Sequence, residues 1–290
     1  MHESAYEHGR QFFEVYWNPR FTDVVELGSQ DVNGSIRDHA PTSARYVGLD
    51  MVEGKGVDMI VVQGERLPLD DESFDVVVTS SAFEHDVCFW ETFLDLVRIT
   101  RPGGLLYINA PSNNAFHRYP LDCWRFYPDS GLALVEWARR QGVEVELVES
   151  FVAAPQASGW CDFIAVFRKA GAPLVRSGRM AALGGAMNVH DIDEPDVTQE
   201  SGPTYDMLTL ADTLARLAES ERSRDELERA LEASAADLAS ARTRVTRLRR
   251  RVEKLRARSA GQSRQLDAIH DSRSWKVTGV ARRIASSVRR

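Results

Sequence analysis

Residues 22–50 read TDVVELGSQDVNGSIRDHAPTSARYVGLD, and this stretch decides the fold. The apolar run 24–27 predicts a strand that enters a glycine turn at Gly28. A helix then leads to a second strand, 46–49, which ends on Asp50. This order of elements opens a nucleotide-binding α/β unit. In such units the glycine lets the backbone approach the ligand, and the acid accepts hydrogen bonds from ribose hydroxyls.

The glycine turn at Gly28 could also be an ordinary turn of an α/β domain, but the segments that follow make this alternative weaker. That alternative exists because Gln30 and Val32 occupy positions where a GxGxxG turn has glycines. Further along, the chain shows in order LPLDDESFD (67–75), an apolar strand (76–78), SSAFEH (80–85), a helix-like segment (90–97), RPGG (101–104) and another strand (105–108).

This order of motifs resembles the class I S-adenosylmethionine-dependent methyltransferases, in particular their broad small-molecule group, over about residues 20–170. The resemblance implies an α/β fold with a doubly wound, seven-stranded, mostly parallel sheet. It also implies S-adenosyl-L-methionine as the cofactor. An NAD-dependent dehydrogenase is the nearest rival, but it would need the missing glycines because its pyrophosphate rests against a helix N-terminus. S-adenosylmethionine has no phosphate.

The resemblance assigns the cofactor contacts residue by residue. Glu26 supports the glycine turn and contacts the methionine part of the cofactor. Asp50 holds both ribose hydroxyls, beside Met51, which packs on adenine. Glu65 falls near the adenine amino group, where the family usually has Asp. The other implied contacts lie in the glycine loop, before Glu65 and after the fourth strand: Gly28, Ser29, Asn33, Gly34, Gly64, Ser80 and Ser81.

Two polar clusters follow the fourth and fifth strands, at 84–86 and 109–129. Methyl transfer to a hydroxyl needs positioning and a general base. The second cluster is dense in His, Arg, Asp, Tyr and Trp, which suits a polyhydroxylated ligand, so we expect a sugar or glycan hydroxyl as acceptor. A structural role is the alternative for each histidine. The candidate catalytic residues are His85 as the first choice of base, His117 as the second, Asp86 and Asp122.

A divalent metal is a second means of activating a hydroxyl. Some sugar O-methyltransferases use Mg²⁺, held by carboxylates, to bind two neighbouring hydroxyls and lower the pKa of one. Asp86, Asp122 and Asp129 could supply oxygen ligands here, although no tight ligand spacing indicates such a site.

The composition divides the chain into an acidic body and a basic end. The 290 residues carry a net charge of −7, yet residues 207–290 contain 20 Lys and Arg against 11 Asp and Glu. No apolar run reaches the roughly 18 residues of a transmembrane helix, and the polar N-terminus argues against a signal peptide. Cys88, Cys123 and Cys161 are widely spaced, which fits a reducing cytoplasm better than disulfides or a zinc site.

A heptad pattern replaces the α/β motifs near residue 207. Apolar residues recur at two seam positions from Leu210 to Ile269, most strongly between Leu227 and Leu255. Val or Leu at the first seam position with Leu or Ala at the second favours a parallel two-stranded coiled coil. We therefore expect a homo-oligomer; a single solvated helix is the alternative. The predicted divisions are a methyltransferase domain (1–170), a linker (171–206), a coiled coil (207–270) and a basic amphipathic tail (271–290).

Part of the linker and the basic tail each allow more than one interpretation. Residues 180–189 of the linker are small and apolar, and could pack back on the domain. The tail combines Trp275 and aliphatic residues at helical spacing with Lys and Arg, which suits an anionic membrane surface. A merely soluble basic tail is the alternative. Nucleic acid is a weaker candidate partner because no groove-reading motif accompanies the arginines.

These observations predict an O-methyltransferase that acts on a sugar hydroxyl of a glycan, glycolipid or polysaccharide precursor. The string SRSWKVTGVAR (272–282) resembles tails of bacterial polysaccharide-assembly enzymes. We expect the protein in the cytoplasm or peripheral to the inner face of the membrane. Two other functions stay open: methyl transfer to another small molecule, and a coiled-coil scaffold with a degenerate domain. Intact Glu26, Gly28 and Asp50 argue against the scaffold.

Overall fold

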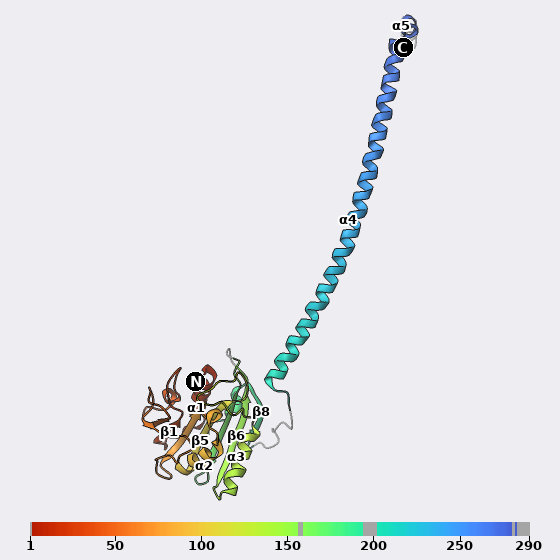
Figure 1. Cartoon of the computed structure of the whole chain (residues 1–290). Helices are drawn as coiled ribbons and strands as arrows, with labels where there is room; N and C mark the ends of the chain where they lie inside the picture. Colours follow the sequence, from red (N-terminus) through yellow and green to blue (C-terminus); the bar gives the residue numbers. More distant parts are fainter. Residues whose placement is uncertain (1, 156–158, 194–201, 280–281, 283–290) are drawn as a thin grey trace. The chain divides into compact units, whose positions relative to one another are not determined.

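The computed structural model of the chain describes residues 2–155, 159–193, 202–279 and 282 (Figure 1). The chain divides into two compact units, residues 1–210 and 211–290. The first unit contains the sheet and the candidate site, and the described part of the second is mostly helix.

The first unit is built on one eight-stranded mixed sheet, in the order β3-β2-β1-β4-β5-β7-β6-β8. The pairs from β3 to β5 are parallel, and β7, β6 and β8 add antiparallel pairs. The apolar runs expected as strands lie within β1, β2, β4 and β5. The strands are β1 (Asp23–Leu27), β2 (Arg45–Asp50), β3 (Met59–Ile60), β4 (Phe74–Ser80), β5 (Thr100–Pro111), β6 (Val145–Ala153), β7 (Asp162–Lys169) and β8 (Ala186–Asp191).

Helices cover both faces of this sheet. Successive side chains of a strand point to opposite faces, so each inner strand contributes to both core clusters. Val77 of β4 packs in one core cluster with Phe93 and Leu134, from two helices on one face. Its neighbour Val76 packs on the other face with Phe12, from the N-terminal helix. The α-helices are α1 (Glu3–Tyr16), α2 (Phe89–Ile99), α3 (Asp129–Arg140), α4 (Tyr205–Asp271) and α5 (Arg273–Val277), with 3₁₀ helices η1 (Ile36–His39), η2 (Phe83–His85) and η3 (Met180–Leu183).

The helix expected between the first two strands is wrong in type. Only the four-residue 3₁₀ helix η1 forms there, and the Ser35 hydroxyl caps it by accepting from the Arg37 backbone N–H. Pro41 follows two residues after the end of η1, and a helix cannot continue through the residue before a proline without strain. The carboxyl ends of β1 and β2 lie side by side because the two strands pair in parallel, with Leu27 opposite Leu49.

The count of seven strands is also wrong, because β8 is an eighth strand. It lies inside the range 171–206, whose composition predicts a linker. It pairs antiparallel with β6. Just before it, the 3₁₀ helix η3 buries Met180 in the core. The small apolar segment 180–189 therefore packs on the domain, which was the alternative interpretation.

The second unit consists mostly of α4, which continues from residue 211 to Asp271 without a break and passes through Gly261. Among its described residues none is buried. The short helix α5 follows, and the guanidinium of Arg282 lies 3.5 Å from the ring centroid of Trp275. The predicted tail positions 280–281 and 283–290 lie outside the described residues. No described helix has the length and apolar character needed to cross a membrane.

Candidate functional site

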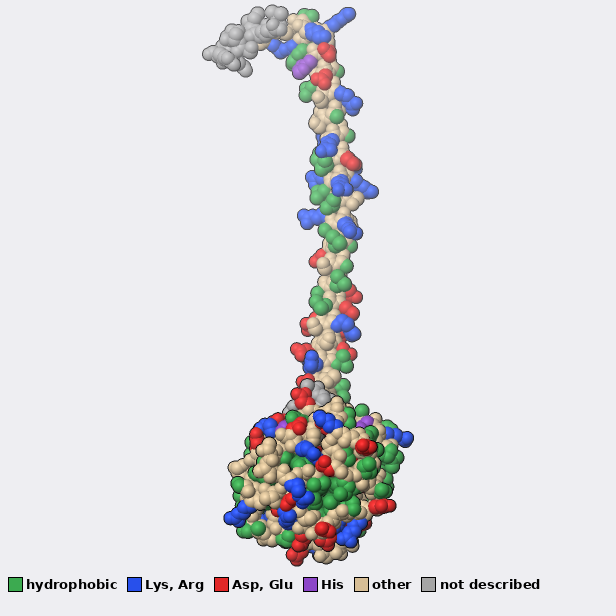
Figure 2. Space-filling view, turned by 90° about the vertical axis from the view of Figure 1, so that its left-hand side faces the viewer, with side chains coloured by type: hydrophobic (Ala, Val, Ile, Leu, Met, Phe, Trp, Pro, Cys, Tyr) green, Lys and Arg blue, Asp and Glu red, His purple; other side chains and the backbone are tan. Residues whose placement is uncertain are grey.

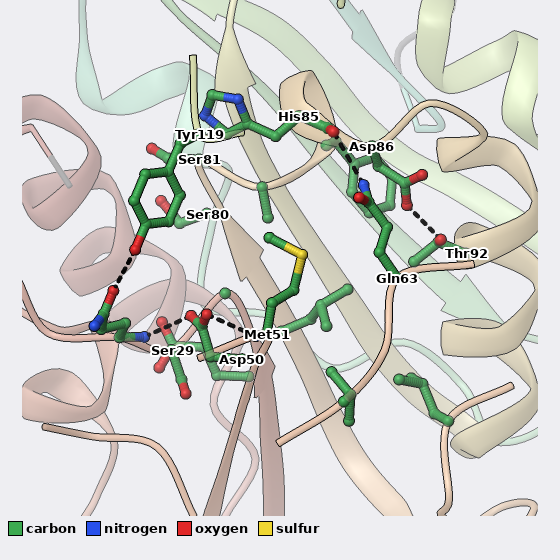
Figure 3. Close-up of a pocket in the computed structure, with 18 of the residues that line it drawn as sticks. Ser29, Asp50, Met51, Gln63, Ser80, Ser81, His85, Asp86, Thr92 and Tyr119 are labelled. Carbon is green, nitrogen blue, oxygen red and sulfur yellow. Dashed lines mark hydrogen bonds between the residues drawn. The ribbon is translucent and has the colours of Figure 1, made fainter. Parts of the chain in front are cut away.

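A cavity of about 810 Å³ lies at the carboxyl ends of β1, β2 and β4. This is the place where open α/β sheets bind ligands, and the volume lies in the usual range for small-molecule sites. The cavity is lined by residues 26–30 at the end of β1, by Asp50 and Met51 at the end of β2, and by residues 80–83 at the end of β4. In Figure 3, the side chain of Met51 points into the cavity from the end of β2.

Asp50 holds the glycine loop through its carboxylate. One oxygen, Oδ2, accepts the backbone N–H of Gln30 at 3.0 Å, and the other accepts that of Met51 at 2.7 Å. The side chain is 7 % exposed and lines the cavity. Oδ1 also accepts the Val52 backbone N–H at 3.4 Å. Because each carboxylate oxygen can accept two hydrogen bonds, Oδ2 is the oxygen that retains capacity for a hydroxyl donor of a ligand.

Gly28 allows the loop to turn close to the end of β4. Its φ is +84°, a left-handed conformation that glycine adopts readily, and an added Cβ would lie 3.0 Å from that of Ala82. The side chain of Gln30 accepts a hydrogen bond from the Tyr119 hydroxyl at 2.7 Å. Through this hydrogen bond, Gln30 links the glycine loop to the polar loop after β5 (Figure 3).

Glu26 is a buried acid at the end of β1. It accepts a hydrogen bond from the Tyr46 hydroxyl at 2.8 Å. Burial raises the pKa of its carboxyl to about 7, and the nearby Arg37 opposes that rise. A cationic ligand in the cavity would favour the ionised form of Glu26.

The structure brings ten of the eleven predicted cofactor residues to the cavity wall. The exception is Asn33, which is exposed and does not line it. Glu65 lines it from an exposed position. Those that line the cavity are Glu26, Gly28, Ser29, Gly34, Asp50, Met51, Gly64, Glu65, Ser80 and Ser81.

Two of these residues carry buried hydroxyls that need a partner. Among the described residues, the Oγ atoms of Ser29 and Ser80 make no hydrogen bond within the protein. Buried polar groups are rarely left unpaired. A polar ligand such as S-adenosylmethionine, with its ribose hydroxyls, amino group and carboxylate, fits these orphaned hydroxyls and the two carboxylates, Glu26 and Asp50.

His85 is held in one tautomer at the cavity wall. Its Nδ1 contacts the carbonyl oxygen of Leu121. A carbonyl oxygen can only accept, so Nδ1 carries the hydrogen and Nε2 carries the lone pair. Burial lowers the pKa of the imidazole below its ordinary 6.5, so the ring is neutral at pH 7. His117, whose ring centroid is 4.9 Å away, also lines the cavity.

Asp86 and Asp122, the two predicted catalytic carboxylates, are engaged within the protein. Asp86 lines the cavity, but its oxygens accept from the Cys88 backbone N–H and the Thr92 hydroxyl at the start of α2. Asp122 does not line the cavity. Both its oxygens accept from Arg125, at 2.6 and 2.9 Å, and this guanidinium lowers the pKa of Asp122 to about 2.

The expected metal ligands are not gathered into one site. The group of described residues whose donor atoms could hold a metal ion is instead Glu84, His85 and His117, within 4.8 Å of one another. Glu84 is buried, and burial raises the pKa of its carboxyl to about 8. Two imidazoles with one carboxylate suit transition metals better than Mg²⁺, which prefers oxygen ligands.

Sequence reasoning missed Gln63 and Thr92, which complete the wall, and assigned no role to Tyr119 within the polar cluster 109–129. Gln63 donates a hydrogen bond to the backbone oxygen of His85 at 3.0 Å. The Tyr119 hydroxyl donates to Gln30, and the Thr92 hydroxyl donates to Asp86. Tyr119 belongs to the polar loop quoted from the sequence, so its density of aromatic residues was the available signal. Nothing in the local sequence around Gln63 or Thr92 marks either residue.

Comparisons with known proteins find methyltransferases. Residues 31–108 match the sequence profile of a family described as "Methyltransferase domain". The chain is 33% identical over 141 residues to the phthiotriol/phenolphthiotriol dimycocerosates methyltransferase of Mycobacterium tuberculosis strain H37Rv, covering 41% of this chain and 52% of that protein. A similarly named Mycobacterium ulcerans protein is 33% identical over 91 residues, 27% of this chain and 34% of that one.

Solved structures show weaker likeness. The [4+2]-cyclase SpnF gives a TM-score of 0.43 at 12% identity over 58% of this chain and 82% of the other. The Burkholderia thailandensis 1,6-didemethyltoxoflavin-N1-methyltransferase, with S-adenosylhomocysteine bound, gives 0.42 at 16% identity over 58% and 77%. With TM-scores below 0.5, neither likeness bears on function.

The sequence matches support an S-adenosylmethionine-dependent methyltransferase, the class that the motifs predict. The chain spans about half the length of the first curated relatives that it matches. The matched profile ends within β5, so the loop after β5 and the helix α4 lie outside it.

Proposed function

We propose that this protein is an S-adenosylmethionine-dependent O-methyltransferase whose acceptor is a sugar hydroxyl. The observation that carries the proposal is His85, a neutral imidazole whose Nε2 carries the lone pair, in the same cavity as Asp50 and Glu26. This Nε2 lies 3.6 Å from a carboxyl oxygen of Glu84. S-adenosylmethionine supplies an electrophilic methyl group. Glu26, Asp50 and the glycine loop would hold it at the strand ends.

The protein's own chemistry is then positioning and proton removal. His85 Nε2 accepts the hydroxyl proton of the acceptor as the oxygen gains the methyl group, and the carbonyl of Leu121 keeps the ring in the required tautomer. A positioned base contributes on the order of 10²–10⁴ in rate. His117 is the second candidate for this role.

The loop after β5 supports a saccharide acceptor. His117, Arg118 and Tyr119 of this loop line the cavity, and Tyr119 is 51% exposed. Trp124 and Tyr127 are also exposed on the loop. Exposed rings beside hydrogen-bonding side chains suit a sugar, which presents apolar faces and hydroxyls. The names of the mycobacterial relatives specify phthiotriol and phenolphthiotriol dimycocerosates, so another hydroxylated small molecule or a lipid is the alternative acceptor.

The acceptor class is tested in cells and with the purified chain. Mass spectrometry of glycans and glycolipids from cells with and without this protein should show a sugar that is one methyl mass heavier only when the protein is present. The purified protein should add the same mass to that isolated acceptor. Methylation confined to a lipid moiety or to a non-sugar metabolite would replace the saccharide proposal by one of its alternatives.

Binding of S-adenosylmethionine should strengthen as pH rises, because Glu26 must ionise to attract the cationic ligand. The pKa of Glu26 is raised to about 7, so its ionised fraction increases about tenfold between pH 6 and 8. Calorimetric titration over this interval should show the dissociation constant falling by up to about tenfold. Glu26→Gln keeps an acceptor for Tyr46 but should show a flat profile; an equal slope in wild type and variant would exclude this role.

A metal-assisted reaction is the second candidate mechanism, and the Glu84, His85 and His117 group favours it. In that case a divalent ion would lower the pKa of the acceptor hydroxyl. His85 Nε2 would then bind the ion and would not accept the hydroxyl proton. EDTA should then abolish turnover, and Mg²⁺ or a transition metal should restore it. Turnover that is insensitive to EDTA would leave the general-base mechanism.

The helical part of the chain is proposed to serve assembly and location. Self-association through α4 would make the enzyme a homo-oligomer, and the basic segment around Trp275 would contact an anionic membrane from the cytoplasmic side. A scaffold with a degenerate domain is the competing function. Failure to bind S-adenosylmethionine in the calorimetric titration would favour the scaffold.

A further inference from the structure

The helix α4 presents an apolar seam that its own chain does not cover. The seam residues are strongly exposed; Leu227, Leu231, Leu238 and Leu255 are 68, 71, 54 and 57% exposed. The seam is mainly apolar, with polar residues such as Arg224 and Ser234 among its members. A mainly apolar stripe at heptad spacing is the surface that a second helix covers in a coiled coil. A second copy of the same chain has this stripe in the same register, and the charges beside the seam determine its direction.

Charge is segregated along α4. Residues 205–238 contain nine Asp and Glu against four Arg, whereas residues 239–271 contain ten Lys and Arg against three Asp and Glu. Figure 2 shows the red side chains along the first part of this helix and mostly blue ones along the later part. A parallel pair would set the basic halves side by side, and an antiparallel pair would set each basic half against an acidic half.

The residues that flank the seam also distinguish a parallel from an antiparallel pair. In a parallel pair, a residue just before the first seam position meets the partner residue five places later, just after the second seam position. This brings Arg244 against Arg249, and Arg251 against Arg256. It also sets the seam residue Arg224 against its own copy. Two favourable pairs, Asp237 with Arg242 and Arg216 with Glu221, only offset these repulsions.

An antiparallel pair has no such repulsion in one full-length register. With Leu231 of one copy opposite Leu248 of the other, the seam overlaps from Leu210 to Ile269. The flanking residues then meet as three kinds of opposite-charge pair, each occurring twice by symmetry: Glu221 with Arg256, Glu228 with Arg249, and Asp237 with Arg244. No like-charge pair falls at the flanking positions in this register.

We propose that α4 pairs with a second copy of this chain as an antiparallel two-stranded coiled coil in that register. The Val and Leu seam residues alone favour the parallel form, but flanking charges specify orientation. At 1.5 Å per residue, the starts of the two paired helices lie about 90 Å apart. The two catalytic units are therefore attached at opposite ends of the rod. This inference rests on the proposed self-association and does not depend on methyl transfer.

Disulfide trapping in the full-length chain tests the orientation. In a background with Cys88→Ser and Cys123→Ser, the exposed thiols are removed and only the buried Cys161 stays. Ser234→Cys and Val245→Cys are then made as separate, differently tagged chains, because these positions lie opposite each other in the proposed register. Mixing and oxidation should give covalent 234–245 heterodimers, with little crosslinking of either variant alone. Homodimers crosslinked 234–234 would overturn the antiparallel arrangement.

Charge reversal gives an independent readout of the dimer dissociation constant. Arg249→Glu should weaken an antiparallel dimer by about tenfold or more, since two attractions become repulsions with Glu228. In a parallel dimer the same change would remove the repulsion with Arg244 and tighten association. Glu228→Arg combined with Arg249→Glu should restore the wild-type constant, and Arg250→Glu, on the outward side of the helix, is the matched control.

Analytical ultracentrifugation separates failure of the orientation from failure of self-association. A monomer at about 100 µM would overturn both. A dimer that tightens on Arg249→Glu would overturn the orientation alone. Calorimetric titration with S-adenosylmethionine on the same samples reports separately on the proposed enzymatic function.

Discussion

Asp50→Asn is expected to weaken binding of S-adenosylmethionine by about 100-fold. The variant keeps the shape of the side chain but loses its charge, and hydrogen bonds to a charged group contribute about 1.5–3 kcal/mol each. An asparagine also offers one acceptor atom in place of two, so the N–H groups of Gln30 and Met51 and the ribose hydroxyls would compete for it. Calorimetric titration of the full-length protein measures the change.

The control for this prediction is Asp70→Asn. Asp70 is exposed and does not line the cavity, so its replacement removes the same charge without touching the site. The melting temperatures of both variants should be compared, since Asp50 also holds the glycine loop. Unchanged affinity in a folded Asp50→Asn protein would contradict the proposed contact between Asp50 and the ribose, on which the assignment of S-adenosylmethionine depends.

His85→Asn is expected to lower the rate of methyl transfer by about 10²–10⁴ while leaving S-adenosylmethionine affinity within a few-fold of wild type. The asparagine amide can still donate to the Leu121 carbonyl, as Nδ1 does, but it has no nitrogen that accepts a proton. The loss would therefore report on the base rather than on the position of the loop. His85→Ala, which removes both functions, should be at least as impaired.

The pH profile of the wild-type rate provides the second test of His85. Burial lowers its pKa below 6.5, and only the neutral imidazole can accept a proton. The rate should thus fall as pH drops through a value below 6.5 and reach a plateau at neutral pH. His39→Ala, away from the cavity, should preserve this profile. Full turnover in both His85→Ala and His117→Ala would rule out general-base catalysis by either histidine.

Local patterns in the sequence were enough to predict most elements of the first unit. The apolar runs at 24–27 and 76–78 lie in β1 and β4 because alternate residues of a buried strand enter the two core layers. The helix between β1 and β2 was mispredicted because Ser35 and Pro41 restrict that connection to a single turn of 3₁₀ helix. The strand β8 was missed because all its residues except Asp191 are only half-buried, so it carries little apolar signal.

The sequence by itself determined the α/β opening, the acids Glu26 and Asp50 at strand ends, and the long helix with its segregated charge, since these depend on residues near one another in the chain. Only the tertiary structure decided the tautomer of His85, which Leu121 sets, and the join between Gln30 and Tyr119. Both contacts link segments far apart in sequence, and their geometry exists only once the sheet has brought the loops after β1, β4 and β5 to one edge.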